Sequence, residues 1–85
     1  MVLLRSEKLG QRLADARGRL AVSANALAKA AGLHHKTVQD IEQGLRSPTV
    51  ETVERLADAL QVSPAWLAFG IGDSHDRSRR TTGNA

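Results

Sequence analysis

Apolar side chains recur along the chain at spacings of three and four residues, and polar or glycine-containing breaks divide the pattern into five segments. Such spacing predicts amphipathic helices. The first helix is expected from about Ser6, its N-cap, to Leu20. Its apolar face is formed by Leu9, Leu13, Ala16 and Leu20. Gly10 and Gly18 lie within it, and each weakens a helix by roughly 1 kcal/mol relative to alanine, so this helix depends on its packing.

Two short segments follow, with only three residues between them. Ser23 is the expected N-cap of a helix over Ala24–Ala31, and Gly32 is expected to end it in the left-handed conformation. The next helix is expected from about His35 to Gln43, and it ends at Gly44 in the same way. Two short helices joined by so tight a glycine-containing turn are typical of a helix-turn-helix motif, here about residues 23–44.

Two further segments complete the pattern. Thr49 is the expected N-cap of a helix from Val50 to about Leu60. Its inner face is predicted to hold Val50, Val53, Leu56, Ala57 and Leu60. Ser63 is the expected N-cap of a last helix over Pro64–Phe69, because proline is favoured at the first helical position. No strand-like alternation is found, so the expected fold class is all-α.

The composition agrees with this pattern. Of the 85 residues, 41% are hydrophobic and 25% are charged, which is typical of a globular domain, but only 2% are aromatic. A core of alanine, leucine, valine and isoleucine suits close-packed helices better than a sheet. We therefore expect an N-terminal arm over residues 1–5, one small domain over residues 6–71, and a disordered basic tail over residues 72–85.

Charge and cysteine content narrow the classes of partner and chemistry. The formal net charge of +3 favours an anionic partner only modestly. The absence of cysteine excludes disulfides, thiolate zinc sites and cysteine nucleophiles, and it agrees with a reducing compartment. No secretory signal or membrane span is predicted, so we expect a cytoplasmic protein with no membrane partner.

The third segment carries a polar stripe. Spacings of one, three, one and three place five hydrogen-bonding side chains on one helix face, namely His35, Lys36, Gln39, Asp40 and Gln43. Leu33, Val38 and Ile41 are expected to point inward, and the small residues Ala28 and Gly32 to allow close approach of another helix. Such a face suits the reading of base edges in a major groove, but it also suits an ordinary solvated surface. Taken alone, the spacing favours the solvated surface.

The stretch from Leu9 to Gly70 resembles the Cro/phage-repressor (XRE-like) family of helix-turn-helix domains. The matching residues are Ser23–Gly44, Arg46–Thr49 and Leu56–Leu67. The resemblance implies a compact five-helix lambda-repressor-like DNA-binding domain, whose third helix enters the major groove. It also implies a homodimeric transcriptional repressor that binds an inverted-repeat operator in double-stranded DNA. No cofactor, metal or small-molecule ligand is expected.

The resemblance also assigns roles to residues. The base-contacting positions it implies are His35, Lys36, Gln39 and Asp40. Lys36 suits guanine O6 and N7, and Asp40 can accept from cytosine N4, so G·C pairs are expected in the half-site. The phosphate-contacting positions are Gln43, Arg46 and Ser47, together with backbone amides near Ala24 and Asn25.

Two further sets of residues match structural positions of the family. Arg17 and Glu42 match an ion pair between the first and third helices, which would position the recognition helix. The dimer interface is expected at the last helix, with Trp66, Leu67 and Phe69, which also seals the core. The sequence departs from the family at His34, where serine or threonine is usual, so the N-cap of the recognition helix is expected to be weak.

Other function classes are weighed against this one. No nucleophile elbow, phosphate loop or paired-carboxylate pattern is present, so an enzyme is not expected. Adjacent His34 and His35 point in different directions and lack a third ligand nearby, so a surface pair is favoured over a metal site. Two alternatives stay open. One is an antitoxin that binds both DNA and a protein toxin, and the other is a helical protein-interaction module without DNA binding.

Overall fold

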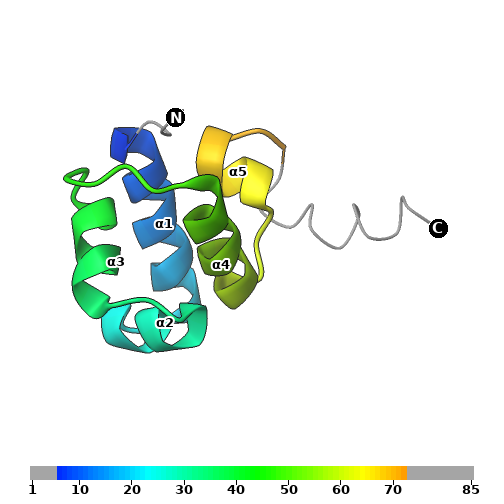
Figure 1. The fold of residues 1–85 in the computed structure, drawn as a ribbon. Coiled ribbons are helices and arrows are strands. Elements are labelled where there is room, and N and C mark those ends of the chain that lie inside the picture. The colour runs from blue at the N-terminus through cyan, green and yellow to red at the C-terminus, as the bar shows by residue number, and fades with distance from the viewer. Residues whose placement is uncertain (1–5, 73–85) are drawn as a thin grey trace.

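The computed structural model describes residues 6–72, and within this range it contains five helices and no strand, which confirms the all-α class (Figure 1). The helices are α1 (Ser6–Leu20), α2 (Ala24–Ala31), α3 (His35–Glu42), α4 (Val50–Leu60) and α5 (Pro64–Phe69). Only the end of α3 differs from the predicted bounds, by one residue. The predicted N-terminal arm, and the predicted tail from residue 73 on, lie outside the described residues. None of these five helices is long and apolar enough to cross a membrane.

Local hydrogen bonds explain where α2, α4 and α5 begin. The hydroxyl of Ser23 accepts from the Ala26 N–H at 3.0 Å, and that of Thr49 accepts from the Thr52 N–H at 3.2 Å. Ser63 caps α5 in the same way. These side chains satisfy backbone donors that have no partner within the helix. The starts of these three helices can therefore be read from single residues.

The core is aliphatic and is shared by all five helices. Its largest fully buried side chains are Leu9, Leu13, Val38, Ile41, Val53, Leu56 and Leu67. Trp66 is only half-buried and packs against this cluster. Val50 was predicted on the inner face of α4 but is 59% exposed, because it is the first residue of the helix and lies beyond the core. Leu20, the last residue of α1, is exposed for the same reason.

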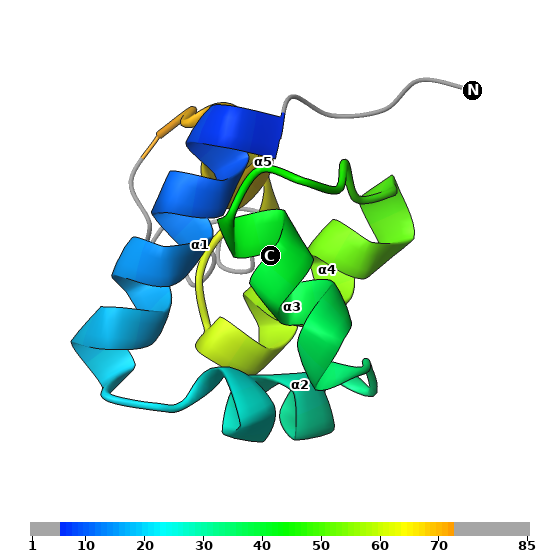
Figure 2. The same ribbon diagram turned by 90° about the vertical axis from the view of Figure 1, so that its left-hand side faces the viewer.

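Helix α1 contacts three of the other four helices. It contacts α3 on one side and α4 and α5 on the other, while α2 runs across one end and contacts α3 and α4 (Figure 1). In the view turned by 90°, α3 lies at the front of the molecule (Figure 2). The arrangement therefore packs α3 against α1 and α2 and leaves its opposite side at the surface.

Gly10 explains how closely α1 and α3 approach. A Cβ atom at this position would lie 2.4 Å from the carbonyl oxygen of Ile41 and 2.8 Å from that of Glu42. Only glycine therefore lets α1 rest against the last turn of α3. The prediction that Gly32 allows such an approach is wrong, since Gly32 is exposed. Its role is to end α2, because its φ of +72° lies in the left-handed region that favours glycine.

Candidate nucleic-acid interface

The outer face of α3 is the candidate interface. Val38 and Ile41 are completely buried and fix the orientation of the helix on the core. On the opposite side, the side chains of His35, Lys36, Gln39 and Gln43 are exposed. The fifth residue of the predicted stripe, Asp40, is only half-buried, with a side chain that is 16% exposed. The structure thus brings four of the five polar residues to solvent.

The start of α3 has a weak cap, as expected from His34. The His34 side chain makes no capping hydrogen bond, and only its backbone carbonyl accepts from Thr37 and Val38. The rings of His34 and His35 lie 6.0 Å apart, and both residues are exposed. Within residues 6–72, no three histidine, cysteine or acidic side chains gather as they would around a metal ion.

The end of α3 is held by α1 through Arg17. The Arg17 Nε donates to Glu42 Oε2 at 2.6 Å, and its Nη2 donates to Oε1 at 3.1 Å. Its Nη1 donates to the carbonyl of Val22 in the loop between α1 and α2. The hydrogen bond with Glu42 raises the pKa of the Arg17 guanidinium above its usual value. A planar fork that bonds both carboxylate oxygens fixes direction as well as distance, so α3 is oriented relative to α1.

Asp40 joins two cations of the candidate interface. Its Oδ1 lies 3.3 Å from Lys36 Nζ, one turn earlier on α3. Its Oδ2 lies 3.9 Å from Arg46 Nη2, in the loop between α3 and α4. Lys36, Asp40 and Arg46 therefore form one charged cluster, called here the Asp40 cluster.

The other predicted phosphate-contacting residues lie on the segments next to α3. Gln43 is exposed at the C-cap of α3, and Ser47 is half-buried in the loop before α4. Asn25 is exposed in the first turn of α2, whereas the side chain of Ala24 packs partly against the core. The backbone N–H groups of this turn are suited to an anion, because they belong to the positive end of the helix dipole.

The α5 region departs from the predicted dimer interface. Leu67 is completely buried in the core, so it is not available to a partner, and that part of the prediction is wrong. Phe69 is 61% exposed. Trp66 is half-buried, with the guanidinium carbon of Arg19 5.9 Å from its ring centroid. Of the three aromatic or leucine residues predicted here, Phe69 alone offers most of its side chain to solvent.

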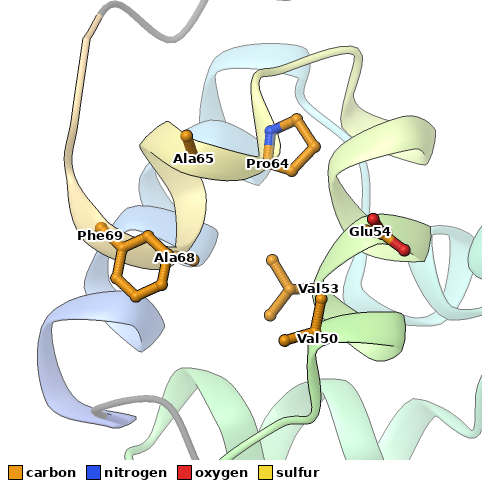
Figure 3. Close-up of a pocket in the computed structure, with 7 residues that line it drawn as sticks. All are labelled: Val50, Val53, Glu54, Pro64, Ala65, Ala68 and Phe69. Carbon is orange, nitrogen blue, oxygen red and sulfur yellow. The ribbon is translucent and has the colours of Figure 1, made fainter.

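An apolar groove of about 220 Å³ lies between α4 and α5 (Figure 3). It is lined by Val50, Val53, Glu54, Pro64, Ala65, Ala68 and Phe69. Val50 and Val53 face Ala68 and Phe69 across the gap (Figure 3). The exposed Val50 thus belongs to a groove that helical periodicity did not reveal.

Arg12 is a structural residue that the sequence analysis missed. Its Nε donates to the carbonyl of Leu67 and its Nη2 to that of Ala68, both at 2.9 Å. Burial lowers the pKa of this guanidinium. The two bonds satisfy carbonyl groups near the end of α5, which is too short to satisfy its own. No sequence signal marks this contact, because the partners are main-chain atoms more than fifty residues away.

Helices α2 and α3 are short and are joined by a tight turn. They pack on a five-helix core that leaves α3 with a polar outer face, and this arrangement defines a helix-turn-helix domain. The family described as "Helix-turn-helix domain" matches residues 8–68. The HTH-type transcriptional regulator DicA of Escherichia coli (strain K12) is 35% identical over 65 residues, which cover 76% of this chain and 48% of DicA. The chain thus spans about half the length of this curated relative.

Two solved structures are similar in both fold and sequence. The restriction-modification controller protein C.AhdI from Aeromonas hydrophila has a TM-score of 0.69 and 35% identity, covering 71% of this chain and 91% of that protein. The P22 c2 repressor, solved with a synthetic operator, has a TM-score of 0.70 and 31% identity, covering 73% of this chain and 94% of the repressor. The chain belongs to the XRE/Cro-like family of helix-turn-helix transcriptional regulators.

Proposed function

We propose that this chain is a sequence-specific repressor of transcription, which binds an inverted-repeat operator in double-stranded DNA as a homodimer. The observation that carries the proposal is the outer face of α3, which presents hydrogen-bonding side chains on a helix locked to α1 by Arg17 and Glu42. A helix held in this way can enter a major groove and present its side chains to base edges. The similarity to the P22 c2 repressor, solved with operator DNA, supports the same docking mode.

The proposed contacts divide into two groups. His35, Lys36 and Gln39 meet base edges, with Lys36 donating to guanine O6 and N7. The phosphate contacts come from Gln43, Arg46, Ser47 and the backbone amides at Ala24 and Asn25. Phosphate contacts position the protein on the duplex, whereas base contacts select the sequence.

The proposed dimer forms through the groove between α4 and α5. A two-fold axis brings the same patch of both copies together, so the exposed Phe69 ring and the apolar groove beside it can complement each other. The two α3 helices then enter successive major grooves, with half-sites about 34 Å apart.

Selection of bound sites from random DNA duplexes tests this function. The expected result is an enriched inverted repeat that contains G·C pairs and is bound less tightly as salt rises. Enrichment of single half-sites would contradict the dimer, and no enrichment above random duplex would contradict sequence-specific binding. A protein-interaction module without a DNA role would bind no duplex at any salt concentration.

One lysine variant and one arginine variant distinguish the proposed base contacts from the proposed phosphate contacts. Lys36→Ala should cost about 1–3 kcal/mol of binding free energy and relax the preference at one base pair. Arg46→Ala should weaken binding to all duplexes equally and reduce the salt slope by about one. If Lys36→Ala instead weakens all sequences equally, Lys36 contacts a phosphate and not a base.

A further inference from the structure

The Asp40 cluster spans α3 and the loop that follows it. One carboxylate oxygen of Asp40 faces Lys36 Nζ at 3.3 Å, and the other faces Arg46 Nη2 at 3.9 Å. The backbone carbonyl of Asp40 also accepts a hydrogen bond from the Leu45 N–H at 2.8 Å. Asp40 therefore holds the loop that carries Arg46 through its main chain and its side chain together.

The three side chains of the cluster lie at different depths. The Asp40 side chain is 16% exposed, whereas Lys36 and Arg46 are 74% and 54% exposed. A duplex approaching α3 therefore meets the two cations before it meets the carboxylate. A residue that reads cytosine must reach its N4 amino group, whereas the Asp40 carboxylate is the least exposed member of the cluster and has a cation on each side.

We infer that Asp40 is a positioning residue that holds Lys36 and Arg46 and thereby sets the ratio of specific to non-specific DNA binding, without reading a base itself. This inference rests on the proposed DNA binding. On an arbitrary duplex, a cation that binds a phosphate gives up its ion pair with Asp40 and leaves this carboxylate unpaired close to a polyanion. The free energy gained from the phosphate contact is therefore offset. On the operator, Lys36 also gains its contact with guanine, which compensates for that loss.

The Asp40→Asn variant removes the charge and keeps the shape of the side chain. Non-specific affinity is expected to rise about three- to tenfold, the range for two partly exposed ion pairs that no longer compete with phosphates. The dependence of log affinity on log salt should steepen by about one for each cation released to a phosphate. Site selection with the variant should return the wild-type half-site, with weaker discrimination against random duplex.

Asp15→Asn is the matched control. Asp15 also pairs with a cation one turn away, since its Oδ2 lies 2.6 Å from Arg19 Nη2, but this pair lies on α1, with Arg19 beside Trp66 of α5. The control removes the same charge from the same residue type, so it reports the effect of net charge alone. Combining Asp40→Asn with Lys36→Ala and Arg46→Ala should abolish the rise in non-specific affinity, because no restrained cation is left to release.

The outcomes separate the alternatives. A changed base preference at one position, with unchanged non-specific affinity, would show that Asp40 reads a base and would overturn the inference. Equal effects of Asp40→Asn and Asp15→Asn would overturn it as well. Side-chain nitrogen resonances of Lys36 and Arg46 in the free protein test the cluster without DNA, and they should shift in Asp40→Asn but not in Asp15→Asn. Shifted resonances in a protein that binds no duplex would contradict the proposed function and not the cluster. If Asp40→Asn does not fold, Asp40→Ser serves the same measurements.

Discussion

Gly10→Ala should destabilise the domain, although alanine is normally the better helix residue. The added Cβ would lie 2.4 Å from the Ile41 oxygen and 2.8 Å from the Glu42 oxygen, and both are main-chain atoms that cannot rotate away. To reach even the tight end of real contacts, α1 and α3 must separate by about 0.6–1 Å at this point. The separation opens the packing around Leu9, Leu13 and Ile41, the largest buried side chains of these two helices.

The magnitude follows from two opposing effects. Overpacking of this kind typically costs about 1–3 kcal/mol. The gain in helix propensity is about 1 kcal/mol. The net loss of unfolding free energy is therefore up to about 2 kcal/mol, which lowers the melting temperature of a domain of this size by up to about 16 °C.

Gly18→Ala is the control on the same helix. A Cβ atom at Gly18 would meet no atom within 4 Å apart from its chain neighbours and the backbone of its own helix. Only the gain in helix propensity therefore remains. Its melting temperature should rise by about 4–8 °C. Thermal unfolding followed by circular dichroism measures both variants under one set of conditions. A Gly10→Ala protein that melts at or above the wild type would refute the close-packing argument, because α1 would then move without cost.

Two further predictions concern contacts that join the helices, and a third concerns the proposed dimer. Glu42→Ala removes the partner of Arg17 and should lower the unfolding free energy by roughly 1.5–3 kcal/mol in urea denaturation. Because this pair raises the pKa of Arg17, its contribution is complete below the unfolded pKa and is lost only as pH rises through the higher folded value. The difference in unfolding free energy between wild type and variant should thus stay constant from about pH 7 to pH 10. A loss of this difference within that range would contradict a raised pKa of Arg17. Arg12→Lys keeps the charge but cannot bond two carbonyls as a fork, so α5 amides should exchange hydrogen faster while α2 amides stay unchanged. Phe69→Ser should shift the proposed dimer to monomer in sedimentation without lowering the melting temperature of the monomer, and an unchanged dimer would place the interface elsewhere.

Local signals explain why the helix bounds were predictable. Ser23, Thr49 and Ser63 each cap a helix with their own side chain, so the boundary is decided by residues next to each other in sequence. Gly32 marks the end of α2 in the same local way. The polar face of α3 was also predictable from spacing. Val38 and Ile41 are apolar and are buried in the core, so the polar residues between them lie on the opposite face.

Tertiary contacts explain what the sequence could not predict. Helical periodicity assigns a face to Val50 but does not say that the core ends before it. Leu67 and Phe69 lie in one short helix, and only the packing of α1 and α4 decides which is buried. The roles of Gly10 and Arg12 depend on main-chain oxygens of distant helices, and the sequence carries no information about where such atoms lie.

The contacts of α1 have a consequence for the length of the operator. One part of α1 is bonded to α5 through Arg12, and other parts are fixed to α3 by Gly10 and Arg17. In the proposed dimer, α1 therefore determines the distance from the symmetry axis to each recognition helix. A displacement of about 1.7 Å in each subunit, doubled by the axis, equals one base-pair step of about 3.4 Å. The packing of α1 would then select the number of base pairs between half-sites.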